Sequence, residues 1–563
     1  MNEQRLLRHY QQIADAPGAV ARLRRFILDL AVRGKLVAQD EKDEPALELL
    51  KRIAIEKARL DRKRSPEREL NTPFEDAERS QLPRNWALAR LADLVTVLNG
   101  RAYKQHELLN AGTPVLRVGN LFTSDKWYYS DLSLDEDKYC NKGDLIFAWS
   151  ASFGPFIWDG EKVIYHYHIW KLPLHSDADL DKGYLYNFLI HKTREIKEAG
   201  HGISMVHMTK EKMQKLLVPV PPLAEQRRIV TKIDELMALC DQLEESRVSR
   251  ETVRDRLTVA TLARLNAPDP DSFREDVVFA LESLPALTAR GDQITRMRKT
   301  ILNLAVRGKL TPQDAGDEPA AGLLERIAKE KSKLLKQRGI KVDRVLPDVD
   351  ESERYFSTPS GWCWARAQDL SLKISDGVHK KPNYVGSGVP FVTVKNLTEG
   401  PGISFRETKF ITERDHAEFI KRTHPEKGDL LITKDGTIGV ARIVETDRIF
   451  SIFVSVALMK MVLPAIAPFL ALCINSDVVR DTIVPKGAAL KHLHLVDLRK
   501  LALPLPPLAE QQRIVAKVDV LMALCDRLEA GLVAGDDLRR RILDALLAEG
   551  VTPSDSRELE AAE

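Results

Sequence analysis

The amino-acid sequence repeats itself once over most of its 563 residues. Residues 26–36 read FILDLAVRGKL and residues 300–310 read TILNLAVRGKL, with nine of eleven positions identical. Residues 221–244 and 506–529 form a second matched pair, which begins PPLAEQ and differs at only five positions. Two units of this length are too long and too few for a solenoid of stacked repeats. The sequence therefore predicts two similar halves, each with a nearly constant frame around a divergent middle.

The matched segments have the spacing of helices that pack on other helices. Apolar residues step by four and three positions along both PPLAEQ segments, which is the pattern of a heptad seam. These positions are Ile229, Ile233, Leu236, Cys240 and Leu243 in the first half, and Ile514, Val518, Leu521, Cys525 and Leu528 in the second. The LAVRGKL segments have similar periodicity and reach Gly34 and Gly308, which predicts a helix end there. Charged amphipathic helices are expected over 46–60 and 321–335.

The divergent middles have a different pattern. They carry short β-rich runs, for example 114–118, 162–167, 390–394 and 449–456, separated by Gly, Asn and Asp turns. This pattern predicts two compact α+β domains. The expected order is a helical region at 1–81, an α+β domain at 82–222, a helical region at 223–345, a second α+β domain at 346–507 and a helical region at 508–563.

The net charge limits how the chain could bind a charged partner. The 85 Lys and Arg residues against 82 Asp and Glu give a formal charge of +3, so no global field draws the chain onto nucleic acid or a membrane. Any such contact must use local clusters. No apolar run approaches the roughly 20 residues of a membrane span, and the first residues lack the apolar stretch of a signal peptide. We expect a cytoplasmic protein without membrane contact, whose five cysteines are free thiols.

Known catalytic motifs are missing from the sequence. It contains no G-x-x-x-x-G-K-[ST], no G-x-G-x-x-G that opens a helix, no H-E-x-x-H and no G-x-S-x-G. His166 and His168 share one face of an expected strand, a spacing that could serve a metal. No Cys or carboxylate cluster accompanies them, so core or surface histidines are the preferred interpretation. We expect a chain that is not an enzyme and binds no cofactor or metal itself.

Two domains that differ in sequence but share one helical frame indicate that each domain recognises a different version of one kind of target. DNA is a candidate, because two domains on a rigid spacer can contact two sites along a duplex. The strongest candidate loops are NGRAYKQ at 99–105 and DGVHKKPN at 376–383, where a turn precedes basic and aromatic residues. They supply the candidate DNA-binding residues Arg101, Tyr103, Lys104, His379, Lys380 and Lys381. A plain solvated turn is the alternative interpretation.

Four further residues are candidates for DNA contact. Lys434 lies in TKDGTIG at 433–439, and Lys491 lies in KGAALKHLH at 486–494. Asn120 and Lys395 lie in the corresponding segments VGN and VKN. An asparagine can read adenine with two hydrogen bonds, although after a strand it is more often a turn residue.

LAVRGKL with its DEPA continuation, PPLAEQ-x-RIV-x-K and the paired KGDL segments closely resemble the specificity subunit of type I restriction-modification enzymes, over about residues 21–547. The resemblance implies two target recognition domains, separated by two long antiparallel coiled-coil helices with approximate twofold symmetry. One domain would read each half of a split, asymmetric DNA sequence. The resemblance also implies two modification subunits that use S-adenosylmethionine to methylate adenine, and restriction subunits that use ATP and Mg.

The near-identical frame indicates where these partners dock, because two copies of one partner need two copies of one surface. The candidate partner-binding residues, placed on expected outer helix faces, are Glu225, Gln226, Arg228, Glu510, Gln511 and Arg513. The alternative function is a coiled-coil scaffold that binds no DNA and whose two modules bind proteins. The mixed charge of the modules is the best argument for that alternative.

Overall fold

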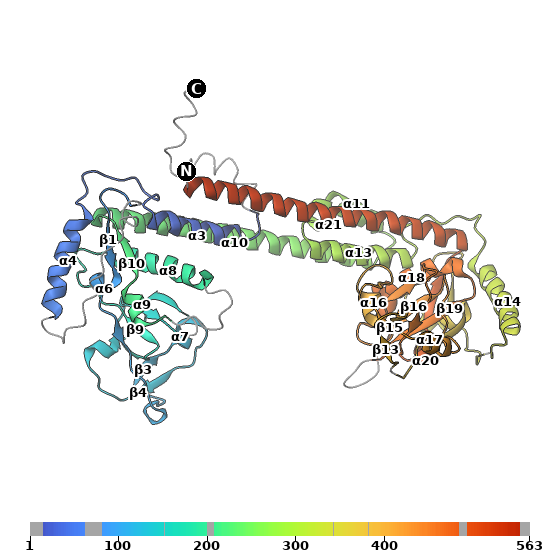
Figure 1. The fold of residues 1–563 in the computed structure, drawn as a ribbon. Helices are drawn as coiled ribbons and strands as arrows, with labels where there is room; N and C mark the ends of the chain where they lie inside the picture. Colours follow the sequence, from blue (N-terminus) through green and yellow to red (C-terminus); the bar gives the residue numbers. More distant parts are fainter. Residues whose placement is uncertain are drawn as a thin grey trace, which may run out of the picture. The chain divides into compact units, whose positions relative to one another are not determined.

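The computed structural model describes residues 15–61, 82–150, 153–199, 208–341, 343–380, 382–483 and 492–551. Its contacts divide the chain into two units, 1–249 with 536–563, and 250–535. Both divisions fall inside helices of 44 residues, α10 (Leu223–Asn266) and α21 (Leu508–Val551), which Figure 1 labels. The expectation of a long helix after each proline pair is therefore confirmed. No helix among the described residues is both long and apolar enough to cross a membrane.

The helical frame of the first unit is formed by α3 (Ala19–Val32) and the first half of α10. The predicted seam is confirmed, because Ile229, Ile233 and Cys240 are buried in one cluster with α3. Arg24 near the start of α3 pairs with Asp241 at 2.5 Å, far along α10. The loop after α3 instead meets the first turn of α10, so the two helices run antiparallel, as Figure 1 shows.

The second unit repeats this frame with α13 (Gly291–Val306) on the first half of α21. Arg298 of α13 pairs with Asp526 at 2.6 Å, while the loop after α13 meets the first turn of α21. Ile514, Val518 and Cys525 of the seam are buried. Leu528 differs from the prediction, because 38% of it is exposed.

The last turns of α10 also belong to this second unit. Arg290 and Asn303, near the two ends of α13, contact Glu251 and Asn266 of α10 in the same order along both helices. Helix α13 is therefore parallel to α10 and antiparallel to α21. It follows that the two long helices run antiparallel to each other in this unit, as the resemblance implies.

The first module lies between strands β1 (Ala87–Arg90) and β10 (Leu217–Val220), which pair with each other. Two four-stranded sheets fill it, in the orders β2-β9-β6-β7 and β4-β3-β8-β5. Their strands are β2 (Leu98–Asn99), β3 (Thr113–Leu116), β4 (Tyr128–Ser130), β5 (Tyr139–Cys140), β6 (Leu145–Ala148), β7 (Gly154–Ile157), β8 (Val163–Tyr165) and β9 (Ile169–Lys171). The helices are α6 (Leu91–Leu94), α7 (Val118–Phe122), α8 (Lys182–Ala199) and α9 (Lys210–Gln214).

The second module lies between the paired strands β11 (Cys363–Arg366) and β20 (Ala502–Leu505) and has a similar plan, although its second sheet has the extra edge strand β13 and no counterpart of β5. Its sheets follow the orders β12-β19-β16-β17 and β13-β15-β14-β18. The strands are β12 (Ser371–Asp376), β13 (Tyr384–Val385), β14 (Val389–Val392), β15 (Lys409–Ile411), β16 (Leu430–Thr433), β17 (Ala441–Ile443), β18 (Ser451–Ile452) and β19 (Val456–Met461). The helices are α15 (Ala367–Leu370), α16 (Val394–Thr398), α17 (Glu413–Phe419), α18 (Ala467–Asn475), α19 (Asp477–Arg480) and α20 (Leu495–Lys500).

Four more α-helices complete the described part of the chain: α4 (Ala46–Asp61) and α14 (Ala320–Arg338) precede the two modules, and α11 (Phe273–Glu282) and α12 (Leu284–Leu287) lie between α10 and α13. Helices α4 and α14 confirm the amphipathic helices expected at 46–60 and 321–335, since one face of each is buried.

The predicted strands are present but shorter than expected. Residues 114–118 and 390–394 each end in the first residue of a helix, α7 or α16. The run 449–456 contains only β18 and the first residue of β19. Beyond the strand ends the apolar residues are less well buried, since Val118 and Val394 are half-buried and Ile449 is 61% exposed.

Candidate nucleic-acid interface

The two loops singled out in the sequence occupy equivalent places in the two modules. Each follows the first strand of a four-stranded sheet, and its glycine lies against the backbone at the end of β8 or β18. Arg101 forms a β-bridge with His166, and Val378 forms the same bridge with Phe453. A side chain at Gly100 or Gly377 would collide with that backbone, so glycine is required by the close approach.

In the first loop, Arg101 and Tyr103 are held by contacts within the module. The Arg101 guanidinium donates to both Glu107 carboxylate oxygens, at 2.7 and 3.2 Å, and this hydrogen bonding lowers the pKa of Glu107. It also lies over the ring of Tyr103, 5.3 Å from the centroid. Burial raises the pKa of Tyr103 to about 12. Lys104 is exposed at the surface of this loop.

A histidine and aromatic cluster beside this loop was missed as a DNA-binding candidate. It consists of Tyr103, Trp149, His166, Tyr167 and His168, and Tyr167 is 40% exposed. Trp149 donates its indole N–H to the Tyr167 carbonyl at 2.8 Å. Burial, with help from His168 and Arg117, lowers the pKa of His166 to about 4, so this ring is neutral near pH 7. The motif YHYH at 165–168 was the available signal, but it was considered only for metal binding.

The same cluster borders a pocket of about 290 Å³. Its walls come from α7, the loop before β4 and the turn after β8, and include Arg117, Lys126, Tyr128, His166 and His168. Arg117 and Lys126 both lie over the Tyr128 ring, 5.1 and 5.2 Å from its centroid. Neither cation was predicted, because nothing in the sequence shows that these two segments meet.

Asn120 also lines this pocket, but its side-chain amide is used within the chain. Its Oδ1 accepts from the backbone N–H of Arg117 at 3.1 Å, and its Nδ2 donates to the carbonyls of Ser124 and Lys126. Asn396 makes equivalent bonds in the second module. The turn interpretation therefore accounts for Asn120, and adenine reading by this side chain would require those bonds to break.

Lys434, a candidate for DNA contact, is turned into the module rather than toward the surface. The residue is only 8% exposed, and its ammonium donates to Asp376 at 2.6 Å. The Asp376 carboxylate is itself buried and also accepts from Arg422 at 2.7 Å. Burial opposes ionisation, but the bonds from Lys434 and Arg422 keep the pKa of Asp376 below its ordinary value. A buried carboxylate needs such partners, which explains why Lys434 faces inward.

The other candidates of the second module have different surroundings. His379 is mostly exposed and lies 3.4 Å from Asp376 and 3.2 Å from Arg422. Lys380 is exposed. Lys395 is exposed and forms an ion pair with Glu407. Lys381 and Lys491 lie outside the described residues. DNA contact by each of these residues stays a prediction.

The predicted partner-binding residues do not share one outer face. Glu225, Gln226, Glu510 and Gln511 are all at most 1% exposed, so the expectation that they lie on the surface is wrong. Each of the two glutamates accepts hydrogen bonds from a tryptophan and from a glutamine in the preceding loop. Gln226 and Gln511 each donate to the carbonyl of a proline just before the long helix. Burial raises the pKa of both glutamates.

The two arginines of this set are more accessible. Arg228 pairs with Asp43 and Arg513 pairs with Asp317, both at 2.6 Å, and more than a third of each arginine side chain is exposed. Partner binding by these two arginines stays a prediction.

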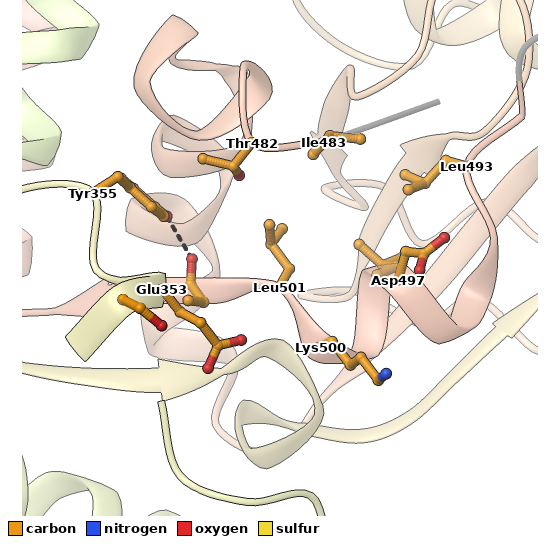
Figure 2. Close-up of a pocket in the computed structure, with 11 residues that line it drawn as sticks. Glu353, Tyr355, Thr482, Ile483, Leu493, Asp497, Lys500 and Leu501 are labelled. Carbon is orange, nitrogen blue, oxygen red and sulfur yellow. Dashed lines mark hydrogen bonds between the residues drawn. The ribbon is translucent and has the colours of Figure 1, made fainter. Parts of the chain in front are cut away.

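A second pocket, of about 530 Å³, lies beside the base of the second module and is shown in Figure 2. Glu353, Asp497 and Lys500 are among its lining residues. Tyr355 donates its hydroxyl to the Ala502 carbonyl at 2.5 Å, and Glu353 binds Arg366. These contacts fasten the segment before β11 to the module. With two carboxylates in its wall, this pocket is a poor match for a nucleic-acid phosphate.

Comparison with known proteins gives one consistent family. The family described as type I restriction modification DNA specificity domain matches residues 83–251 and 373–534. The chain is 28% identical to the type I restriction enzyme EcoAI specificity subunit of Escherichia coli, over 94% of this chain and 93% of that protein. It is also 28% identical to the EcoEI specificity subunit of Escherichia coli, with the same coverage.

A chain from a solved structure on complex assembly and conformational transition of the type I R-M system is also similar. The alignment has a TM-score of 0.47 and 17% identity, and it covers 85% of this chain and 99% of that chain. The family match alone covers more than half of the sequence and falls on both halves of the internal repeat. The chain therefore belongs to the type I restriction modification DNA specificity domain family.

Proposed function

We propose that this chain is the DNA-recognition subunit of a type I restriction-modification system and binds a bipartite, asymmetric site on double-stranded DNA. The observation that supports this most is the pair of modules that share the strand order of one four-stranded sheet and three strands of the other, with different side chains at matching positions. His166 and His168 of the first module correspond to Phe453 and Ser455 of the second. A shared scaffold with divergent loops suits two different half-sites.

The division of labour follows from this role. The chain would supply sequence recognition and no catalytic step, while two modification subunits would bind S-adenosylmethionine and methylate adenine. Restriction subunits would use ATP and Mg to translocate and cleave DNA. The names of the EcoAI and EcoEI relatives support the assignment as a specificity subunit.

Matching apolar residues on the two long helices support docking of two copies of one partner. Leu239 and Leu524 occupy the same repeat position and are 53% and 39% exposed. Val248 and Val533 are also exposed but lie nine residues further along each helix, on the opposite face, so the proposed docking site is the Leu239 and Leu524 face. Each unit thus carries one copy of the same exposed apolar residues. Exposed apolar side chains on charged helices are typical of a protein interface, so we place the modification subunits here.

Two measurements test the proposal. In a fluorescence titration with random-sequence and genomic duplexes, DNA binding should weaken linearly with salt on logarithmic axes. A scaffold that binds only proteins would give no salt-dependent DNA binding. Mapping methylated adenines genome-wide, with and without this chain, should then reveal a split sequence that is methylated only in its presence.

A further inference from the structure

The pocket beside the first DNA loop has an unusual charge arrangement. The Arg117 guanidinium and the Lys126 ammonium approach one ring, that of Tyr128, within about 5 Å of its centroid. Over the described ranges, neither cation has a carboxylate within ion-pair distance. Arg101, Lys138, Lys162 and Lys171 of the same module each do. Two neighbouring cations repel each other, and an anion between them would remove that cost.

The remaining wall of the pocket suits an oxyanion. Ser124 and Tyr128 bring hydroxyl groups, and His166 and His168 bring imidazole groups. Burial, with smaller effects of His168 and Arg117, lowers the pKa of His166 to about 4 and keeps the ring neutral near pH 7, and a neutral imidazole still has one N–H donor. The pocket volume of about 290 Å³ is ample for one phosphate group and its ester links.

The pocket is continuous with the first candidate loop. His166 forms both the pocket wall and the β-bridge to Arg101, and its ring stacks on Tyr103 with 6.4 Å between centroids. A phosphate in the pocket would therefore lie close to the start of the 99–105 loop. At the matching positions of the second module, Thr393, Phe453 and Ser455 replace Arg117, His166 and His168.

We propose that the Arg117–Lys126 pocket binds a backbone phosphate of double-stranded DNA. This inference rests on the proposed function and adds a positioning site in the first module. Phosphate contacts fix the register of a protein on the duplex and are independent of base sequence. The pocket therefore contributes affinity, while the base contacts come from the neighbouring loop and turn.

The test is the salt dependence of DNA binding by the full chain, measured by fluorescence anisotropy on a random-sequence duplex. The double variant Arg117→Gln/Lys126→Gln should reduce the magnitude of the slope of log affinity against log salt by about 0.9, the value for one lost phosphate contact. Arg117→Lys, which keeps the charge, should retain the slope. Lys162→Gln is the matched control, because Lys162 also lies over a tyrosine ring but pairs with Glu136.

The possible results test the proposed function and the phosphate site separately. If the unchanged chain shows no salt-dependent binding, the proposed function fails. If it binds and the double variant keeps its slope while circular dichroism shows it folded, the phosphate site is overturned. A loss of affinity confined to particular sequences, with an unchanged slope, would also overturn it, because that result describes a base contact.

Discussion

Trp86 donates its indole N–H to Glu225 at 3.0 Å, in a buried position at the base of the first module. Trp362 makes the same bond to Glu510 at 2.9 Å in the second half. The other carboxylate oxygen of Glu225 accepts from Gln39 in the loop after α3. One side chain thus joins the first turn of a long helix, the start of a module and the preceding loop.

This junction predicts two equal losses of stability. Glu225→Ala or Glu510→Ala leaves a buried tryptophan N–H without an acceptor, at about 1–3 kcal/mol, whereas the exposed glutamine amide can bond to water. We expect each variant to lower the free energy of unfolding by about 1–3 kcal/mol in urea titrations. Glu235→Ala, on the exposed face of α10, is the control and should cost less than about 0.5 kcal/mol. Clearly unequal losses in the two halves would refute the equivalence of the junctions.

His166 predicts a pH dependence of stability. Burial lowers its pKa in the fold to about 4, with His168 and Arg117 adding to the effect, whereas an unfolded histidine titrates near 6.5. Between these values the unfolded chain binds the extra proton, so stability falls as the pH drops from about 6.5 to 4. His166→Phe, which copies Phe453, should flatten this part of the profile of unfolding free energy against pH. If the unchanged chain and His166→Phe give parallel profiles, His166 is not the group that causes the loss of stability at low pH.

The buried Lys434–Asp376 pair predicts a non-additive double variant. Lys434→Met removes one of the cations that compensate a buried carboxylate, which should cost about 3 kcal/mol. Adding Asp376→Asn, the residue type found at the equivalent Asn99, removes the carboxylate charge and should restore at least half of that loss. Chemical unfolding of the full chain measures both.

A surface pair provides the control for this cycle. Lys427 and Asp447 are mostly exposed and 3.3 Å apart, so Lys427→Met should cost less than about 1 kcal/mol. If Lys434→Met behaves like this control, the buried pair does not stabilise the second module.

The frame was predictable because its signals are local. The heptad seam and the helix ends at Gly34 and Gly308 depend on residues a few positions apart, and the structure confirms them. The site was only partly predictable. Burial of Lys434 is set by Asp376, 58 positions away, and burial of Glu225 by Trp86, 139 positions away. Such long-range partners leave no periodic trace in one sequence, so neither burial was predicted.

The duplicated apolar residues of the long helices predict the stoichiometry of the assembly. Leu239→Ser should weaken one docking position for the modification subunit and leave the other intact, so the copurified ratio should fall from two to one. Leu239→Ser with Leu524→Ser should remove both copies. Val278→Ser on α11, which is exposed but not repeated, should leave two copies bound. Full retention of both subunits by the double variant would exclude this surface.

The last prediction concerns the glycines that seat the two DNA loops. In Gly100→Ala the new methyl group would overlap the His166 carbonyl oxygen and lie 2.5 Å from that of Tyr165. In Gly377→Ala it would overlap the Ile452 carbonyl oxygen. Backbone atoms inside a sheet cannot move aside cheaply, so each variant should lose about 1–3 kcal/mol of stability.

The displaced loop should also weaken DNA binding, because the bridge between Arg101 and His166 would open. Gly386→Ala is the control in the second module, since open space surrounds that position, and its stability and affinity should match the unchanged chain. Thermal unfolding and anisotropy titration measure the two effects separately. If Gly100→Ala lost stability but kept full affinity in a folded protein, the seated position of the 99–105 loop would not be needed for DNA recognition.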